Sequence, residues 1–371
     1  MNDNNSLPYA VMPPEWDERF DATLISWPHA ATDWNYMLQE VDRCYCFMLE
    51  ALLRARQTVV IVTPEPERVR SMIDAFMAEL GDDNAPRHPG GFDALAERVL
   101  MARCDTNDTW IRDYGPLAMQ EPDKDTLTAV SWKFNGWGLK FAADKDNLVT
   151  LQLYKSKLLC ADMIARKNYV LEGGSVESDG EGTILTTESC MLSINRNGFY
   201  KRAEVEKALA NGMGAQRVLW LTRGALEGDD TDGHIDTLAR FAPGNVIFYV
   251  KSYNAEDPHT AELDAMEQEL RSFISPAGTP YSLLALPLPD PVYDENGERL
   301  PATYANFLIT PRAVIMPVYN QPRNDSMARQ MLSIAFADRE IITVDCSALI
   351  RQHGSLHCAT MQLTSLPETL L

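Results

Sequence analysis

The chain has 371 residues, of which 45% are apolar and 23% are charged, the composition of an ordinary globular protein. Its formal net charge of −20 repels phosphate backbones, so we expect no nucleic-acid partner. No apolar run approaches the ~18 residues that span a bilayer, which argues against a membrane partner. Seven scattered cysteines with no CxxC pair indicate free thiols in a reducing cytoplasm and no structural zinc site.

The first 80 residues predict helices on either side of one strand. The start of the chain lacks the basic and apolar regions of a signal peptide. Between residues 32 and 79, apolar residues recur at helical spacing, and the β-branched run Thr58–Thr63 interrupts them as a strand. A second helix is expected to open at the Pro-Glu-Pro-Glu sequence that starts with Pro64. The turn-rich stretch Gly81–Gly91 is predicted to be a surface loop.

One pattern recurs after residue 100: a polar residue, an apolar strand, a turn of Gly, Pro, Asn or Asp, and a second strand. Each repeat predicts a β-hairpin. We expect about five ββα-type units around an axis, in one domain covering residues 1–371, because no linker divides the chain. The strand Ala22–Trp27 is then expected to pair with the strand of Cys358, which removes exposed sheet edges. The polar residues expected at the common centre are Asp113, Glu172, His234, Asn306 and Cys358.

The segment Asn107–Pro116 is the first cluster with chemical potential. It packs charged groups, an aromatic residue and a Gly-Pro turn into ten residues. A strand ending in a polar turn is one interpretation, and a binding site for a planar cation is the other. A guanidinium stacks on an aromatic face and forms paired hydrogen bonds with a carboxylate, roles that Trp110 and Asp113 would fill.

Two further clusters combine acids with glycine or histidine. Glu172 precedes two glycines at the start of a strand, which permits close backbone approach, although a simple turn is equally compatible. The segment Gly228–Asp236 carries four acids around His234. It predicts a divalent-metal site, an acid/base pair in which His234 and Asp236 share one face of a strand, or merely an acidic turn.

The last cluster, Gly354–Gln362, contains Cys358 next to His357. Successive residues of a strand point to opposite faces, so His357 is expected to point away from Cys358 and not to act as its base. A buried cysteine is inert by default, and the case for Cys358 therefore depends on the other clusters.

The four clusters together fit attack on a guanidinium carbon, which is a poor electrophile because resonance spreads its charge. An enzyme must hold the cation with carboxylates, supply a thiolate and protonate the departing nitrogen. Cys358 is the candidate nucleophile, and His234 is the candidate acid and base. Asp113 and Asp236 would hold the cation, while Glu172 would orient His234 or a substrate nitrogen.

These motifs resemble the agmatine deiminase and bacterial-type peptidylarginine deiminase family of guanidino-group-modifying enzymes. The resemblance covers nearly the whole chain. The matching motifs, in order, are Met12-Pro-Pro-Glu-Trp16, Ser26-Trp-Pro28, Asn107–Pro116, Glu172-Gly-Gly, Thr231-Asp-Gly-His-Ile-Asp236 and His357-Cys358. The resemblance implies an α/β fold, the five-bladed α/β propeller called pentein, with no metal and no organic cofactor.

The resemblance also implies a reaction and its participants. The reaction is hydrolysis of agmatine, a small cationic guanidine, to N-carbamoylputrescine and ammonia, a step toward putrescine. The implied roles are Cys358 as nucleophile, His234 as acid/base, Asp113, Asp236 and Glu172 as guanidinium partners, and Trp110 against the substrate.

Two departures from the family pattern bear on the substrate. Gln352–Leu356 stands where typical agmatine deiminases have a run of glycines followed by Asn-Ile. Asp230 stands four residues before the histidine, in place of the usual Glu. Asp230 and Asn306 are the further residues expected to contact the substrate. Peptidyl-arginine or another small guanidine stays open as an alternative to agmatine.

Other reaction classes are compatible with parts of the sequence. An amidinotransferase would use the same residues and pass the amidino group to an amine. A divalent-metal hydrolase would use the acidic segment instead, and EDTA would abolish its activity. The oligomeric state is open, a homo-oligomer included. The ligands of the metal alternative would be Asp229, Asp230, Asp232, His234 and Asp236.

Overall fold

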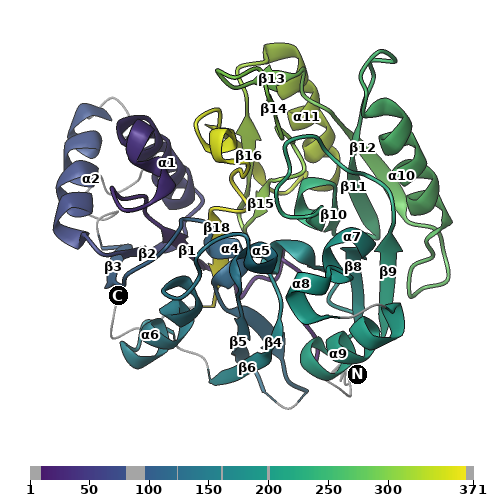
Figure 1. Cartoon of the computed structure of the whole chain (residues 1–371), viewed down its shortest axis with the longest axis horizontal. Coiled ribbons are helices and arrows are strands. Elements are labelled where there is room, and N and C mark those ends of the chain that lie inside the picture. The colour runs from purple at the N-terminus through teal and green to yellow at the C-terminus, as the bar shows by residue number, and fades with distance from the viewer. Residues whose placement is uncertain (1–9, 81–96, 123, 160–161, 199–200, 365–371) are drawn as a thin grey trace.

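The computed structural model describes residues 10–80, 97–122, 124–159, 162–198 and 201–364 (Figure 1). Within them, the chain forms an α/β fold of five sheets, each with three or four strands, and one separate two-stranded hairpin. Every one of the five sheets contains one antiparallel pair and at least one parallel pair. Parallel neighbours need a crossover connection, and here a helix provides it.

Four of the sheets repeat one order: a hairpin, a crossover helix and a strand parallel to the second hairpin strand. The hairpins predicted from the sequence are confirmed at all four positions. The elements are β4 (Leu117–Gln120), β5 (Leu127–Lys133), α6 (Val149–Lys155) and β6 (Met163–Val170); β7 (Glu177–Ser178), β8 (Thr183–Thr187), α9 (Arg202–Met213) and β9 (Arg217–Leu221); β10 (Ala239–Ala242), β11 (Val246–Lys251), α10 (Thr260–Ser272) and β12 (Ser282–Pro287); β15 (Leu308–Ile309), β16 (Ala313–Val318), α11 (Pro322–Ala335) and β17 (Glu340–Asp345).

The fifth sheet joins the two ends of the chain, in the order β18-β1-β2-β3. The predicted pairing of the first and last strands is confirmed, with Ala22 opposite Leu363 and Ile25 opposite Thr360. Figure 1 shows β1 in purple beside β18 in yellow. The strands and crossover helices of this sheet are β1 (Ala22–Ser26), α1 (Leu38–Arg54), β2 (Thr58–Thr63), α2 (Pro66–Leu80), β3 (Val99–Arg103) and β18 (Thr360–Leu363).

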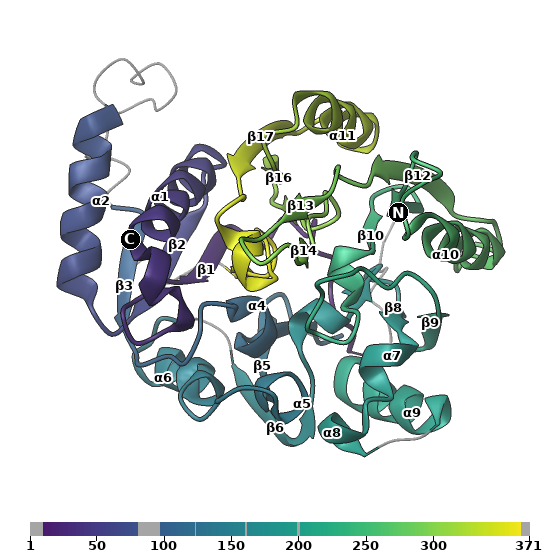
Figure 2. The same ribbon diagram turned by 45° about the horizontal axis from the view of Figure 1, so that its top comes forward.

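The crossover helices lie around the outside of the molecule, as Figure 2 shows for α2, α6, α9, α10 and α11. Helix α1 has the predicted apolar face: Tyr45, Met48, Leu49 and Leu52 are buried against the sheet. The loop predicted at Gly81–Gly91 lies outside the described residues. Among the helices of the described ranges, none has both the length and the apolar character needed to cross a membrane.

Short one-turn segments lead into the hairpins and carry the polar residues expected at the centre. Asp113 lies in α4 (Ile111–Tyr114), which contacts η4 (Gly173–Ser175), and η4 in turn contacts η5 (Ile235–Thr237). The remaining elements are η1 (Asp33–Met37), α5 (Gly136–Leu139), η3 (Asp146–Leu148), α7 (Glu188–Met191), α8 (Ile194–Asn197), β13 (Val292–Tyr293), β14 (Arg299–Leu300) and η6 (Leu349–Gln352).

The prediction that His234 and Asp236 share one face of a strand is wrong. Residues 235–237 form a 3-10 turn, and strand β10 begins only at Ala239. The turn is held by the hydroxyl of Thr237, which donates to the His234 carbonyl at 2.8 Å. A local side chain-to-backbone bond of this kind competes with strand pairing, which explains why an alternating pattern did not form a strand here.

Candidate active site

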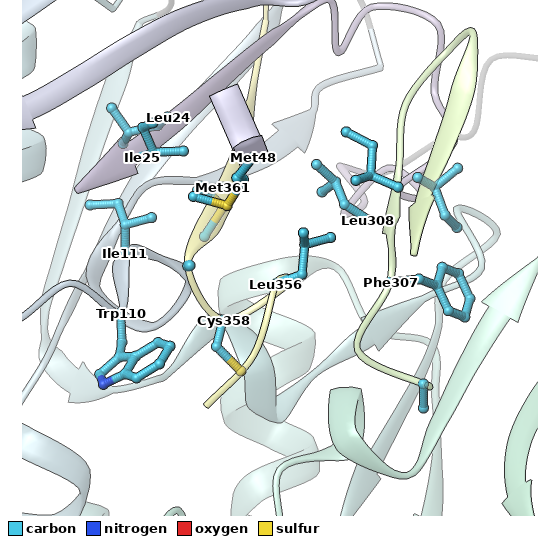
Figure 3. Close-up of a cluster of buried hydrophobic side chains, with 14 of the residues drawn as sticks. Leu24, Ile25, Met48, Trp110, Ile111, Phe307, Leu308, Leu356, Cys358 and Met361 are labelled. Atoms are coloured by element: carbon cyan, nitrogen blue, oxygen red, sulfur yellow. The ribbon is translucent and has the colours of Figure 1, made fainter. Parts of the chain in front are cut away.

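Cys358 lies in the turn that leads into β18 and is only 7% exposed. Figure 3 shows its sulfur and the Trp110 indole on the same side of a buried apolar cluster. Asn306 holds the residue in place, since its Oδ1 accepts from the Cys358 amide and its Nδ2 donates to the sulfur, both at 3.3 Å. Burial, together with the charges of Asp236 and Asp113, raises the pKa of the thiol well above its usual value. The empty site therefore contains a neutral thiol.

His234 is buried between two carboxylates. Its Nε2 lies 2.7 Å from Oε2 of Glu172, and its Nδ1 lies 3.6 Å from Oδ1 of Asp113. Burial lowers the pKa of the imidazole, but Asp113, Cys190 and Glu172 raise it more, so the pKa lies well above the ordinary value. At neutral pH His234 is therefore a cation that can release a proton to a leaving group.

Glu172 is fixed by an ion pair that the sequence did not reveal. Arg196, in α8, donates its Nε to Oε1 at 2.9 Å and its Nη2 to Oε2 at 2.8 Å. Burial raises the pKa of Glu172, but His234 and Arg196 lower it by more than burial raises it, so the carboxylate stays ionised. Glu172 does not line the cavity described below, and its geometry suits orienting His234 and not contacting a substrate.

Asp113 lines the cavity beside His234, and two donors fix its carboxylate. The amide of Gly174 donates to Oδ1, and Nε1 of Trp137 donates to Oδ2, both at 2.9 Å. Burial raises the pKa of Asp113 to about 6, although the His234 charge opposes the shift. Trp137 was also missed from the sequence. It sits in the turn α5 with a left-handed backbone at φ 53° and ψ 49°, a conformation that non-glycine residues rarely adopt.

Gly174 explains the second glycine of the Glu-Gly-Gly motif. A Cβ atom at this position would lie 2.6 Å from Nδ1 of His234 and 3.0 Å from the nearest carboxylate oxygens of Asp113 and Asp236. Those contacts are shorter than van der Waals separation. The absence of a side chain therefore allows the three polar groups to converge on one point.

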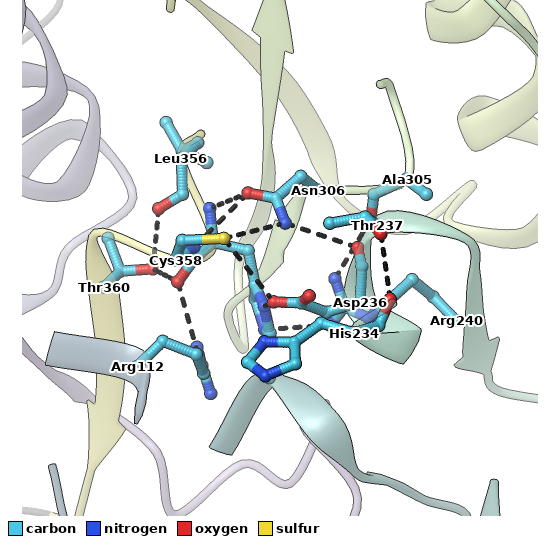
Figure 4. Close-up of polar contacts among 12 residues, drawn as sticks. Arg112, His234, Asp236, Thr237, Arg240, Ala305, Asn306, Leu356, Cys358 and Thr360 are labelled. Atoms are coloured by element: carbon cyan, nitrogen blue, oxygen red, sulfur yellow. Dashed lines mark hydrogen bonds and ion pairs between the residues drawn. The ribbon is translucent and has the colours of Figure 1, made fainter. Parts of the chain in front are cut away.

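Asp236 is 0% exposed and lies next to the sulfur. Its Oδ2 is 3.8 Å from the Cys358 sulfur and 2.7 Å from Nδ1 of His357 (Figure 4). Burial raises the pKa of Asp236, but the hydrogen bond and charge of His357 lower it more, so the group is ionised. Its Oδ1, and Nδ1 of His234, are buried atoms that have no hydrogen-bond partner among the described residues. Buried polar atoms are normally partnered, so these two are available to a ligand.

A cavity of about 520 Å³ opens above these groups, within the size range of small-molecule sites. Trp110 and Trp137 contribute aromatic walls, and several further carboxylates belong to the lining. Asn306 is not part of the lining, contrary to the expectation that it contacts a substrate. Asp236 is also outside it, directly behind Cys358 at 3.8 Å from the sulfur. The lining residues are Asp33, Tyr36, Asp108, Trp110, Asp113, Trp137, Phe141, Asp229, Asp230, Thr231, His234, Thr237, Arg351, Gln352, His353, Gly354 and Cys358.

Comparison with known proteins places this geometry in a family. The sequence pattern of the Porphyromonas-type peptidyl-arginine deiminases matches residues 11–364. The chain belongs to this family. A Legionella pneumophila (strain Paris) protein, provisionally named an agmatine deiminase, is 30% identical over 355 residues, covering 95% of this chain and 94% of the relative.

Two solved structures of similar proteins share the fold over their whole length. A Porphyromonas gingivalis protein, provisionally named an arginine deiminase, is 42% identical with a TM-score of 0.85, covering 96% of this chain and 98% of that chain. A variant of C. jejuni agmatine deiminase with substrate bound is 34% identical with a TM-score of 0.81, covering 96% of each chain.

The acidic segment of this peptidyl-arginine deiminase family member does not assemble the ligands of the metal-hydrolase alternative. Asp229 accepts from Thr231 and from the amide of Gly233 within its own loop. Asp232 is paired with Lys140 and Arg196. In the described part of the chain, the ligand groups close enough to hold an ion are Glu172 with Cys190 and His234, and Glu15 with Glu177 and His357. These two trios share only His234 with the predicted set.

Asp230 lines the cavity, as the sequence predicts, whereas its neighbours bind within the protein. Its backbone carbonyl accepts from Lys140 at 2.5 Å, which fixes the loop and leaves the carboxylate toward the cavity. Burial raises the pKa of Asp230, and the nearby charge of His353 opposes this shift.

The segment Gln352–Leu356, which departs from the family pattern, contributes Gln352, His353 and Gly354 to the rim of the cavity. His353 has a left-handed backbone, with φ 65°, where glycine is the residue that adopts it without strain. Its Nδ1 donates to the Gly228 carbonyl at 2.7 Å and links this rim to the Asp230 loop. Gly354 keeps its glycine, because a Cβ there would lie 2.4 Å from the Trp110 ring.

His357 points away from the cavity, but for a reason other than strand alternation, since residues 356–359 form a turn. Its ring lies between Asp236 and Glu15, whose Oε2 is 2.7 Å from Nε2. Glu15, in the N-terminal Met-Pro-Pro-Glu-Trp motif, was noted in the sequence only as part of a resemblance. Arg240, between Glu15 and Glu177, completes this buried network and was not predicted.

Proposed function

We propose that this protein is a guanidine deiminase that hydrolyses agmatine to N-carbamoylputrescine and ammonia through a covalent intermediate on Cys358. One observation carries the proposal. Cys358 and the protonated His234 line the base of a single cavity, and buried Asp236 lies just behind the lining, 3.8 Å from the sulfur. Asp236 and His234 each keep one polar atom without a partner among the described residues. The free carboxylate oxygen of Asp236 suits a guanidinium N–H, and the free N–H of His234 suits a departing amine nitrogen.

Asp113 and Asp236 would hold the guanidinium in plane. Both carboxylates are buried, so hydrogen bonds to a cation are stronger there than in water. The cation would also stabilise the ionised form of Asp113, whose pKa in the empty site is about 6. Trp110 would lie against the planar group, where the face of an indole attracts a cation.

The proposed chemistry has two half-reactions. A cation beside Cys358 favours loss of the thiol proton to water in the cavity, and the thiolate attacks the guanidinium carbon. The carbon–nitrogen bond breaks as His234 gives its proton to the leaving nitrogen, which releases ammonia and leaves an amidino thioether. Neutral His234 then takes a proton from water, and the resulting hydroxide attacks the same carbon. The carbon–sulfur bond breaks, and the proton left on the ureido oxygen passes to the departing thiolate, which restores the neutral thiol.

The ammonium end of agmatine would lie near Asp230. This carboxylate lines the cavity and has no side-chain hydrogen bond among the described residues, whereas Asp229 is bonded within its own loop and Asp232 is paired with Lys140 and Arg196. Asp33 and Asp108 add negative charge to the same cavity. Asn306 would act on the nucleophile and not on the substrate, by holding the sulfur.

The proposed setting follows from the same residues. The five sheets would be the blades of a five-bladed propeller, with residues 1–371 as one catalytic domain around the site. The product would enter putrescine and polyamine synthesis in the cytoplasm, without a cofactor. A homo-oligomer is compatible with this proposal.

A second substrate class, peptidyl-arginine, has support of its own. The family is described by that activity. Arg351 and Gln352 also line the cavity, and their side chains offer hydrogen-bond donors, whereas the ammonium end of agmatine needs only acceptors. Nε of Arg351 and Nε2 of Gln352 have no hydrogen-bond partner among the described residues. A substrate with a distal carbonyl or carboxylate would use them.

Ammonia release measured with agmatine, free arginine and an arginyl peptide separates the two substrate classes. Agmatine should be turned over fastest, and free arginine should be slow because its carboxylate meets Asp230. Ammonia release should survive EDTA and be lost after iodoacetamide treatment. Turnover of the peptide with agmatine inert would assign the protein to the peptidyl-arginine class, and loss with EDTA would reject the thiol mechanism.

A further inference from the structure

A buried chain of polar groups connects the N-terminal segment to the catalytic groups, and the proposed mechanism does not use it. Glu15 lies 342 positions from His357 in sequence, yet its Oε2 is 2.7 Å from the ring. The other ring nitrogen is 2.7 Å from Asp236, which touches the Cys358 sulfur at 3.8 Å. All four residues are at least nine-tenths buried.

Both ring nitrogens of His357 lie 2.7 Å from a carboxylate oxygen, Nδ1 from Oδ2 of Asp236 and Nε2 from Oε2 of Glu15. A carboxylate only accepts, so Nδ1 donates to Asp236. The ring is thereby fixed between the two acids, with its Nδ1–H toward the carboxylate that lies beside the sulfur.

Arg240 lies on the other side of the ring. Its Nη2 donates to Oε2 of Glu15 at 2.6 Å and lies at hydrogen-bond distance, 3.1 Å, from Nε2 of His357. Arg240 is also paired with Glu177, and Arg112 donates to the His357 carbonyl at 3.3 Å. Three described groups face Asp236 from the side of the cavity: Cys358, His234 and Asp113.

We propose that His357 is a positioning residue, held between Glu15 and Asp236, that orients the Asp236 carboxylate for the substrate. The role rests on the proposed function, because it acts through the carboxylate that would hold the guanidinium. His357 fixes Oδ2 of Asp236 and thereby directs the unpartnered Oδ1. The Asn306 side chain fixes the same residue from its backbone, by accepting from the His357 amide at 2.9 Å. His357, which precedes the nucleophile in sequence, thus positions the Asp236 carboxylate that would bind the substrate, and it does not act on the sulfur.

A matched pair of acids tests the proposal. Glu15 and Glu177 both pair with Arg240, but only Glu15 has a hydrogen bond to His357. We expect Glu15→Gln to lower kcat/KM for agmatine about 10- to 100-fold, the usual effect of losing a group that orients a ligand residue. Glu177→Gln should change the melting temperature at least as much with less than a threefold effect on kcat/KM. Equal losses in both variants, in proportion to lost stability, would show that the network is only structural.

Two substitutions of His357 separate its contacts. The amide of Asn occupies nearly the place of Nδ1 and reaches Asp236, whereas the amide of Gln occupies nearly the place of Nε2 and reaches Glu15. His357→Asn should therefore retain at least tenfold more kcat/KM than His357→Gln. A His357→Gln protein that retains as much kcat/KM as the His357→Asn protein would overturn the proposal.

A third readout does not need turnover. The alkylation rate of Cys358 by iodoacetamide, followed by mass spectrometry of its peptide against pH, reports the thiolate directly. The charge of Asp236, 3.8 Å from the sulfur, raises the pKa of the thiol, so displacing this carboxylate should move the profile to lower pH in the His357→Gln protein, with the Glu177→Gln profile unchanged. If wild-type protein leaves agmatine intact but the alkylation profiles shift as expected, the proposed function fails and the positioning role stands. Coincident profiles would reject the positioning role.

Discussion

The floor and the rim of the cavity are built in different ways. On the floor, each catalytic candidate is buried and held by at least one defined partner, such as Asn306 for Cys358 and Arg196 with His234 for Glu172. On the rim, Asp230 and Gln352 line the cavity, and neither side chain has a hydrogen bond to another residue in the part of the chain that the structure describes. The floor also keeps the motif residues of the family, while the rim carries the two departures from it. We infer that the floor determines the chemistry and the rim determines which guanidine is accepted.

The largest expected effect is at the floor. Cys358→Ser should fold and bind agmatine but lose at least about 10³-fold in kcat, because a covalent nucleophile is worth several orders of magnitude. Initial rates of ammonia release and the agmatine dissociation constant would measure the two properties. A variant that keeps more than about a tenth of the wild-type rate would contradict the covalent mechanism.

Crowding the floor should be nearly as harmful as removing a group from it. Gly174→Ala places a methyl group 2.6 Å from Nδ1 of His234 and 3.0 Å from oxygens of Asp113 and Asp236. Displacing catalytic groups by about 1 Å costs roughly 100-fold, so we expect that loss in kcat. Circular dichroism melting should show a folded protein. An alanine variant with wild-type kcat would mean that the three groups do not act together.

The contrast between floor and rim also describes what the sequence predicts. The hairpins and the β1–β18 pair follow from local patterns of apolar residues and turns, and the structure confirms them. The residues of the floor come from segments that each carry a recognisable motif, so the sequence brings the right candidates forward. Their partners lie in segments without such a signal, because the contact is made only in three dimensions.

Arg196 and Trp137 show the limit of sequence reasoning most clearly. Arg196 lies 24 positions from Glu172, in a short helix with no motif, and Trp137 lies 24 positions from Asp113 in a left-handed turn. Neither spacing corresponds to a helix or strand period. The assignment of His234 and Asp236 to one strand was wrong for a related reason. The hydroxyl of Thr237 closes a turn by bonding the His234 carbonyl, and the alternation of apolar residues gives no sign of such a bond.

A smaller effect is expected at the rim. Asp230→Asn should raise KM for agmatine about tenfold with a smaller change in kcat, because the contact with the ammonium group is the same in the ground and transition states. n-Butylguanidine lacks that ammonium, so its KM should be unchanged by the substitution. Asp33→Asn is the matched control, since this carboxylate also lines the cavity. A similar loss with both substrates would place Asp230 in the structure of the loop and not in substrate binding.

The smallest expected effect lies where floor meets wall, at the bond from Trp137 to Asp113. Trp137→Phe keeps an aromatic ring but removes the N–H that donates to Oδ2 at 2.9 Å. That donor stabilises the ionised carboxylate, so its loss raises the pKa of Asp113 above its value of about 6. Ionised Asp113 is the form that holds a cation, and activity is lost as pH falls through this pKa. The acidic limb of the kcat/KM profile should therefore move up by at most about one pH unit, equal to about 1.4 kcal/mol. A profile that moves to lower pH, or a fall in activity that is the same at every pH, would contradict this prediction. Either result would mean that the indole acts on the substrate by contact alone and that ionisation of Asp113 does not cause the acidic limb.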